Sequence, residues 1–236
     1  MSLAPDLVAT LETVTTATIT TMLLKKGIRH CWMKGAMPFS GQTGKRIVGP
    51  AFTLRFVPVR EDLATPASWA KPISTRGAIE AMPEGCIAVA DAMGVTTAGI
   101  FGDILCMRMM RRGVIALVTD GVVRDKAGVV ATGLPVWCQG TAAPASVNGL
   151  TFVGWQEPIA CGGVAVFPDD IIVADDDGVV LVPKDLLGFV VDEGEEHERY
   201  ETWVVSEVER GVALPGLYPP NDEAKARYAA WKTKRS

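Results

Sequence analysis

Three charged side chains, Asp103, Arg124 and Asp125, occupy two glycine-containing segments of the chain. Asp103 follows Gly102, and the Arg124-Asp125 pair comes shortly after Gly121. Two carboxylates beside one arginine suit a hard divalent cation and an anionic substrate, because carboxylate oxygens bind such cations and a guanidinium binds carboxylates through parallel hydrogen bonds. We therefore expect enzymatic chemistry if the fold brings the two segments together.

A βαβ unit is predicted to bring these segments together. Apolar runs at Cys86–Asp91 and Val114–Thr119 are typical of strands buried on both faces, and a helix is expected over Asp103–Arg112, ended by Gly113. Strands joined in this way run parallel with a right-handed crossover. The carboxyl ends of both strands then lie at the same edge of the sheet, where ligands of parallel α/β sheets bind.

The first turn of the expected helix offers free backbone N–H groups, those of Leu105 and Cys106 among them, to a carboxylate or phosphate. Gly102 allows a ligand to approach the backbone closely. Two structural interpretations stay open at this point. Asp103 is also a good N-cap residue, and an arginine followed by an aspartate is often a surface ion pair.

Magnesium or manganese is the expected metal, because the candidate ligands are oxygen atoms. The two histidines, His30 and His197, are distant in sequence from both segments and are interpreted as structural or solvated, which argues against a zinc site. Lys126 is expected to face solvent, and no lysine lies inside an apolar strand, so imine chemistry is disfavoured. The chain contains no Walker A, GxGxxG or GxSxG motif.

Bulk properties exclude several classes of protein. The formal net charge is −4 and no basic block stands out, so we expect no nucleic-acid partner. We see no signal peptide and no apolar run of membrane-spanning length, so no membrane association is expected. Five scattered cysteines without a CxxC pair point to reduced thiols and a cytoplasmic location.

The remaining elements are predicted from periodicity and turn residues. A helix is expected over Thr10–Leu24, and Asp175–Gly178 is expected to form a hairpin turn by its Asp-Gly signal. Further strands are expected at residues 49–57, 134–138, 147–158, 163–167, 171–174 and 179–182, with a short helix over 75–82.

The C-terminal part is predicted to be helical. A long, charged, amphipathic helix is expected over Lys184–Arg210, weakened by Gly188 and Gly194, and its apolar residues are expected to pack within an oligomer. The segment Lys225–Arg235 is expected to be a solvated terminal helix. These elements favour one α/β domain over residues 1–236, with a mixed sheet and helical N- and C-terminal extensions.

Three blocks, Gly102–Leu105, Asp120–Asp125 and Cys161–Pro183, together resemble the family of 4-hydroxy-4-methyl-2-oxoglutarate aldolases and regulator of ribonuclease activity A, the RraA-like family. The resemblance covers about residues 10–210. It implies a swivelling-domain-like α/β sandwich. The segment Arg60–Arg76 and the extension 211–236 look like additions to the compact pattern, and we expect both to reshape the distal end of the substrate pocket.

The resemblance also implies an activity and roles for named residues. Aldolase members use a divalent metal to cleave 4-hydroxy-2-oxo acids to pyruvate and a second oxo acid, and they decarboxylate oxaloacetate. Carried over, Asp125 would be the direct metal ligand and Asp103 would hold metal-bound water. Arg124 would contact the pyruvyl group, and the amides of Leu105 and Cys106 would hold its carboxylate.

The resemblance implies, further, a homotrimer or homohexamer with sites between subunits. An acidic residue from a neighbouring subunit's C-terminal helix would join each site, and the sequence offers Glu193, Glu195, Glu196 and Glu198 without distinguishing them. A metal-dependent class II pyruvate aldolase is therefore the leading interpretation. A non-catalytic regulator that binds a protein partner is the alternative, since a shared fold does not fix function. Methyl transfer is a poor third, because no glycine-rich nucleotide loop follows an early strand.

Overall fold

The computed structural model describes residues 3–39 and 44–234. The helices are α1 (Pro5–Leu11), α2 (Thr16–Lys25), α3 (Thr75–Ala81), α4 (Asp103–Arg111), α5 (Lys126–Ala131), α6 (Leu187–Glu209) and α7 (Asp222–Thr233). Short 3-10 turns cover Pro66–Ala70, Ser146–Asn148 and Lys184–Leu186. The strands are β1 (Met37–Pro38), β2 (Ile47–Pro58), β3 (Ile87–Asp91), β4 (Ala116–Thr119), β5 (Val136–Cys138), β6 (Leu150–Trp155), β7 (Ile159–Cys161), β8 (Val164–Val166), β9 (Ile171–Asp175) and β10 (Gly178–Val182).

A mixed sheet forms the centre of the fold. Its strand order is β1-β5-β4-β3-β2-β9-β10, with β6 also paired to β2, and β7 and β8 form a separate hairpin. The neighbours β2, β3, β4 and β5 run parallel, whereas β9 and β6 are antiparallel to β2. The predicted mixed α/β sheet and the parallel pairing of the two apolar strands are therefore confirmed.

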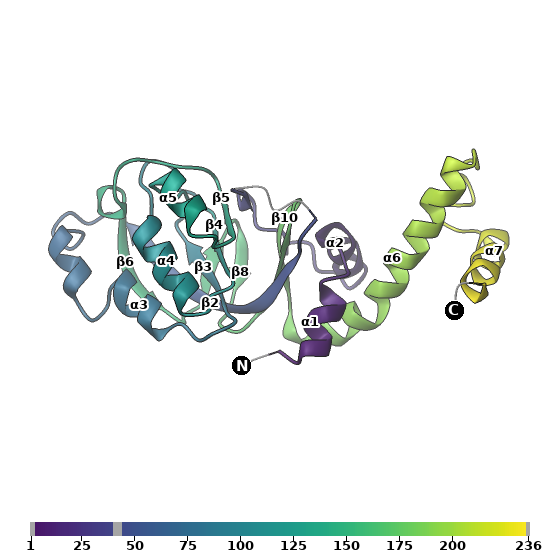
Figure 1. Cartoon of the computed structure of the whole chain (residues 1–236), viewed down its shortest axis with the longest axis horizontal. Coiled ribbons are helices and arrows are strands. Elements are labelled where there is room, and N and C mark those ends of the chain that lie inside the picture. The colour runs from purple at the N-terminus through teal and green to yellow at the C-terminus, as the bar shows by residue number, and fades with distance from the viewer. Residues whose placement is uncertain (1–2, 40–43, 235–236) are drawn as a thin grey trace.

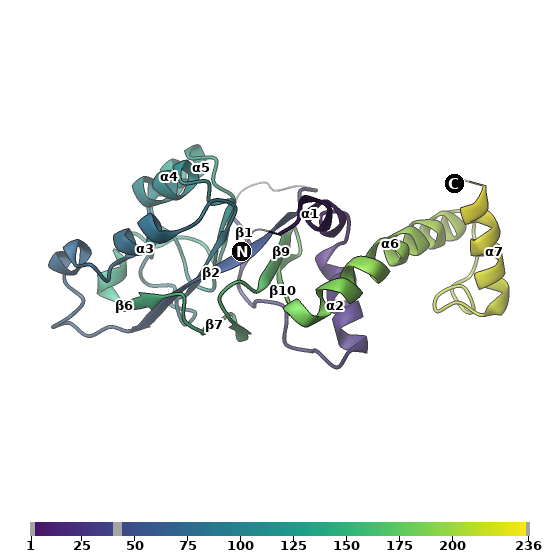
Figure 2. The same cartoon turned by 90° about the horizontal axis from the view of Figure 1, so that it is seen from below.

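Helices α3, α4 and α5 cover one face of the parallel strands (Figures 1 and 2). The apolar layer between them includes Phe56, Phe101 and Met109, which are buried. A second layer on the opposite face surrounds Trp137, whose indole N–H donates to the carbonyl of Asp175 at 2.8 Å. Both faces of β3 and β4 are thus buried, which explains their continuous apolar sequences.

The N-terminal helical region differs from the prediction. The single helix expected over Thr10–Leu24 is divided into α1 and α2, separated at residues 12–15. The side chain of Thr15 caps the second helix, accepting a hydrogen bond from the N–H of Thr18 at 3.1 Å. A threonine side chain that accepts a hydrogen bond from a backbone N–H in this way begins a new helix, so α1 does not continue into α2.

No single helix of the described residues is long and apolar enough to cross a membrane; α1 and α2 would qualify only as a pair, and they are bent by 97°.

The predicted long helix is present as α6, and it leaves the body of the molecule (Figures 1 and 2). Its first turns pack with α1 and α2 against β9 and β10, and its far end packs against α7. The expected terminal helix is therefore α7, which begins at Asp222; Arg235 lies outside the described residues. Helix α7 is not wholly solvated, because Tyr228 packs against the buried Trp203 and Trp231 stacks on Tyr228.

The two glycines of α6 do not break it, and they have different surroundings. Gly194 is buried, and a Cβ atom at this position would lie 2.7 Å from Cγ2 of Val14, whereas a Cβ at Gly188 would meet nothing within 4 Å. Gly194 therefore lies close against Val14, in the connection between α1 and α2. The absence of a side chain there is required by packing.

We expect Gly194→Leu to lower the free energy of unfolding by about 1–3 kcal/mol, because the larger side chain must displace buried Val14. Gly188→Ala is the matched control, and it should raise stability by up to about 1 kcal/mol through helix propensity alone. Urea denaturation followed by circular dichroism measures both. Equal effects of the two substitutions would contradict the packing role of Gly194.

Candidate functional site

Hydrogen bonds join the two loops that carry the predicted site. Strands β3 and β4 end side by side, with Ala90 in register with Thr119. Beyond them, the N–H of Ile100 donates to the carbonyl of Val122 at 2.9 Å, and the N–H of Arg124 donates to the carbonyl of Phe101 at 2.9 Å. The loop that leads into α4 and the loop that leads into α5 therefore form a continuation of the parallel pairing.

This pairing brings Asp103, Arg124 and Asp125 together. The Arg124 Nε atom donates to Asp125 Oδ2 at 3.1 Å. Asp103 begins α4, where its Oδ1 accepts a hydrogen bond from the N–H of Ile104 at 2.7 Å. The two carboxylates and the guanidinium border one cavity of about 530 Å³.

Three glycines make this close arrangement sterically possible. A Cβ at Gly102 would overlap with Oδ2 of Asp125, and a Cβ at Gly99 would lie 2.8 Å from Cβ of Arg124. A Cβ at Gly128, in α5, would lie 2.6 Å from Oδ2 of Asp103. The absence of these side chains leaves room for the two carboxylates.

Asp125 has an unusual backbone conformation. It precedes α5 with φ 55° and ψ 49°, in the left-handed region that few residues other than glycine adopt. Non-glycine residues held in this region cost free energy and cluster at functional sites. The conformation directs the carboxylate to the space beside Gly102. Helix α5 was not predicted from the sequence, since it is short and contains both a glycine and neighbouring valines.

The cavity includes all but one of the residues predicted for the site. Gly102, Asp103, Leu105, Arg124 and Asp125 line it. Also in its wall are Trp69, Thr75, Arg76, Gly99, Ile100, Ile104, Arg108, Ala145 and Ser146. Trp69 and Arg76 come from the segment of residues 60–76 that is expected to reshape the pocket, whereas none of the described residues of the C-terminal extension lies in this wall.

Cys106 is the predicted residue that does not reach the cavity. Its side chain is fully buried, and its N–H donates to the carbonyl of Gly102 at 3.0 Å as an ordinary helical hydrogen bond. The amides of Asp103 and Leu105 precede this bond in the first turn and have no acceptor within the helix. Leu105, rather than Cys106, is therefore the amide available to an anionic ligand.

The other residues considered for chemistry lie elsewhere. Neither histidine lines the cavity, and His197 has its Nε2 atom 3.3 Å from Oε1 of Glu201 on α6. Lys126 is exposed, with its ammonium 5.4 Å from the centre of the Phe39 ring. No group of three or more histidine, cysteine or acidic side chains that could hold a metal occurs within residues 3–39 and 44–234.

The four glutamates proposed for a neighbouring subunit's site differ in their contacts within the chain. Glu195 and Glu196 both form ion pairs with Arg199, and Glu196 also pairs with Lys232. Glu198 accepts hydrogen bonds from the backbone and side chain of Thr15, both at 2.8 Å. Glu193 is exposed and forms no ion pair in the part of the chain that the structure describes.

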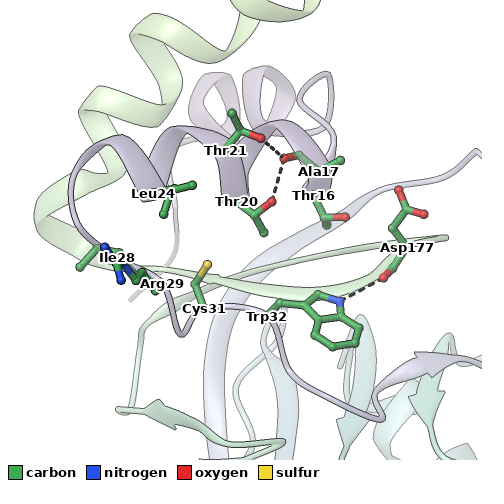
Figure 3. A pocket seen from close by; sticks show the side chains of 10 residues that line it. All are labelled: Thr16, Ala17, Thr20, Thr21, Leu24, Ile28, Arg29, Cys31, Trp32 and Asp177. Carbon is green, nitrogen blue, oxygen red and sulfur yellow. Dashed lines mark hydrogen bonds between the residues drawn. The ribbon is translucent and has the colours of Figure 1, made fainter.

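A second hollow, of about 670 Å³, lies beside α2 (Figure 3). Three of its polar groups already have partners: the hydroxyls of Thr20 and Thr21 donate to the carbonyl of Ala17, and the indole of Trp32 donates to the carbonyl of Asp177. Asp177 is the one carboxylate residue in its lining. This hollow lacks the paired carboxylates of the site beside α4, and we assign it no chemistry.

Comparison with known proteins places the chain in a family. A family model described as RraA-like, Aldolase/RraA, matches residues 16–181. The chain belongs to the RraA-like family. A crystal structure of Streptomyces coelicolor RraAS2, described as an unusual member of the RNase ES inhibitor RraA protein family, superposes with a TM-score of 0.76. The two chains are 34% identical, and the superposition covers 86% of this RraA-like chain and 97% of the other.

Two relatives match only part of this RraA-like protein. The Legionella pneumophila protein DlpA is 32% identical over 63% of this chain, but the match spans 23% of DlpA. A Halalkalibacterium halodurans protein, whose name proposes a 4-hydroxy-4-methyl-2-oxoglutarate aldolase, is 36% identical over 59% of this chain and 60% of its own length. The matched part of this RraA-like chain thus covers less than two thirds of either relative.

All five cysteines are free and buried, and burial governs their protonation. Desolvation, reinforced by the nearby Asp103 charge, raises the pKa of the Cys106 thiol to about 12. Desolvation likewise raises the pKa of Cys86 to about 11, and that of Cys161 well above its ordinary value. Since the thiolate is the reactive form, none of these thiols is prepared to act as a nucleophile near neutral pH.

We expect the native protein to be inert to Ellman's reagent at pH 8, with all five thiols reacting after denaturation in guanidinium chloride. Absorbance at the wavelength of the released thionitrobenzoate measures the number of reacting thiols. Fast reaction of one thiol in the native protein, lost in Cys106→Ser, would contradict the purely structural assignment of Cys106.

Proposed function

We propose that this RraA-like protein is a divalent-metal-dependent lyase that cleaves a 4-hydroxy-2-oxo acid to pyruvate and a second oxo acid, and that it decarboxylates oxaloacetate. The observation that carries the proposal is the convergence of Asp103, Arg124 and Asp125 on one cavity, across two hydrogen-bonded loops. The matched relative whose name proposes an aldolase supports the same reaction class.

The donor set fits Mg²⁺ or Mn²⁺. Asp125 and Asp103 contribute carboxylate oxygens, and Mg²⁺ is commonly held by one or two carboxylates together with water. Among the described residues, neither histidine lines the cavity and Cys106 is fully buried beside it, so no nitrogen or sulfur ligand is offered there. A bound cation would supply Lewis-acid stabilisation to the oxyanion that develops at the 2-oxo group.

The residues of the chain would bind and orient the substrate around that cation. Arg124 would hold the pyruvyl end through its guanidinium, and the free amides of the first turn of α4, that of Leu105 included, would bind the carboxylate. Since Oδ1 of Asp103 is engaged by the N–H of Ile104, Oδ2 is the atom left to orient a water that takes the proton from the C4 hydroxyl. Loss of this proton accompanies cleavage of the C3–C4 bond and leaves the pyruvate enolate.

Assembly would complete the site. We place Glu193 of a neighbouring subunit there, because the other three candidates on α6 are engaged within their own chain. The projecting end of α6 carries the exposed apolar residues Val205 and Val208, which favour contact with another subunit. The assembly we propose is a homotrimer or homohexamer, in the cytoplasm.

A protein-binding regulator is the second candidate, favoured by the similarity to RraAS2, which belongs to the RNase ES inhibitor RraA protein family. A regulator does not need the arginine and the two carboxylates at a cavity. A pyruvate-release assay over 4-hydroxy-2-oxo acids and oxaloacetate separates the two functions. If no substrate gives pyruvate when Mg²⁺ or Mn²⁺ is supplied to the oligomer, the lyase is excluded and the protein-binding regulator is favoured.

Metal removal should abolish activity. We expect pyruvate release to stop after treatment with EDTA and to return when Mg²⁺ or Mn²⁺ is added, because the developing oxyanion otherwise lacks its main stabilising charge. A coupled lactate dehydrogenase assay follows the product. The control is the thermal unfolding curve with EDTA, which should still show a folded protein. Undiminished turnover after exhaustive chelation would contradict the metal requirement.

Substitutions in the Arg124-Asp125 pair should separate binding of the metal from binding of the substrate. Asp125→Ala should abolish lyase activity at any Mg²⁺ concentration that leaves the protein folded. Arg124→Lys should lower the rate by about two orders of magnitude, because lysine lacks the planar pair of donors. Arg55→Lys, at an exposed ion pair with Glu157, is the matched control and should be neutral. A lyase indifferent to Asp125→Ala would place the active site elsewhere.

A further inference from the structure

The cavity beside α4 contains three guanidinium groups, and two of them already have carboxylate partners. Arg124 contacts Asp125, and Arg108 binds Glu80 through two hydrogen bonds of 2.8 and 2.7 Å. The third is Arg76, on the first turn of α3. Within residues 3–39 and 44–234, Arg76 forms no ion pair with a carboxylate. Arg76 is therefore the guanidinium of this cavity wall that has no carboxylate partner among the described residues.

Arg76 is nevertheless held in place. Its guanidinium carbon lies 4.8 Å from the centre of the Trp69 ring, which also lines the cavity. Stacking on an indole fixes the plane of a guanidinium while leaving its N–H groups free to bind a ligand. Burial lowers the pKa of Arg76 from its ordinary value, with no neighbouring negative charge to offset the loss of hydration.

The local backbone keeps Trp69 against α3. Trp69 belongs to the 3-10 turn Pro66–Ala70, and Ser74 caps α3 by accepting a hydrogen bond from the N–H of Gly77 at 3.2 Å. A Cβ at Gly77 would collide with the carbonyl oxygen of Pro72, so this position must be glycine for the segment to pack so closely. The arginine and its aromatic support thus form a part of the cavity wall that the βα loops do not supply.

We propose that Arg76, supported by Trp69, binds a second anionic group of the substrate, so that the site selects dianionic 2-oxo acids over monoanionic ones. The inference rests on the proposed function, in which Arg124 and the amides of α4 hold the 2-oxo carboxylate end. A carboxylate at the distal end of the ligand would then supply the counter-charge that Arg76 lacks. Arg76 is a specificity-determining residue on this assignment and takes no part in breaking the bond.

Two inert ligands test the proposal by binding alone. Pyruvate carries the 2-oxo carboxylate only, and 2-oxoglutarate adds a second carboxylate two carbons further on. Isothermal titration of the intact oligomer with each ligand, in the presence of Mg²⁺, gives two dissociation constants for the unmodified protein and for each variant. The matched control is Arg111→Gln, which removes an exposed arginine on α4 that does not line the cavity.

We expect the unmodified protein to bind 2-oxoglutarate more tightly than pyruvate. Arg76→Gln should weaken 2-oxoglutarate binding by about tenfold to a hundredfold and leave pyruvate binding within about twofold, the loss typical of one charge-assisted contact. Arg76→Lys should retain part of the preference, and Arg111→Gln should retain all of it. A protein without preference for the dianion, or an Arg76→Gln variant that binds both ligands equally weakly or as tightly as before, would overturn the proposal.

The outcomes also separate this proposal from the proposed function. Binding of 2-oxoglutarate that depends on Arg76, without pyruvate release from any 4-hydroxy-2-oxo acid, would support the anion subsite and defeat the lyase. Pyruvate release with a selectivity unaffected by Arg76→Gln would support the lyase and defeat the subsite. Failure of both ligands to bind at millimolar concentration would defeat both.

Discussion

The hydrogen bonds between the loop after β3 and the loop after β4 are the interaction on which the candidate site depends. They extend the parallel sheet beyond its last regular residues, from Ile100 to Val122 and from Arg124 to Phe101. Without them, Asp103 and Arg124 would belong to separate, independently moving loops. With them, the charged side chains are attached to two strands whose every side chain is buried. Because the groups are already in position, no free energy is needed to reorganise them when the reaction occurs.

Close packing of backbone is the second constraint, and it is met by glycine. Gly99, Gly102 and Gly128 each lie where a Cβ would strike Arg124, Asp125 or Asp103. The arrangement concentrates two negative charges and one positive charge in a small volume. The left-handed backbone conformation of Asp125 adds to the free-energy cost of this cluster. Burial of the large apolar layers on both faces of the sheet stabilises the fold and so offsets this local strain.

The sequence predicts the centre of this fold better than its periphery. The strands at β3 and β4 and the helix at α4 follow from continuous apolar runs and from Gly113, because both faces of these strands are buried. Helix α5 has no such signal. Its residues Lys126–Ala131 include Gly128 and two valines, and it forms because Val129 is buried and Gly128 accommodates Asp103. Tertiary packing overrides weak local propensity there.

The same contrast applies within the site. Asp103, Arg124 and Asp125 are predictable because parallel strands deliver their following loops to one edge. Trp69 and Arg76 carry no motif, and their place in the cavity wall depends on how a 3-10 turn rests against α3. The amide of Cys106 is likewise hard to assign from sequence. Because Gly102 is the N-cap of α4, its carbonyl accepts the first hydrogen bond of the helix, and the donor is the N–H of Cys106.

The two walls of the cavity differ in how freely they can change during evolution. One wall is made by the loops after β3 and β4, where an inserted or deleted residue would shift the hydrogen bonds that continue the strand pairing. The other wall is contributed by the first turn of α3 and by Trp69 in the surface connection before it, which pairs with no strand of the sheet over Pro66–Ala70. Such connections tolerate changes of length and sequence. A lineage could therefore exchange this segment and acquire a different ligand while the charged cluster and its supporting sheet stay untouched.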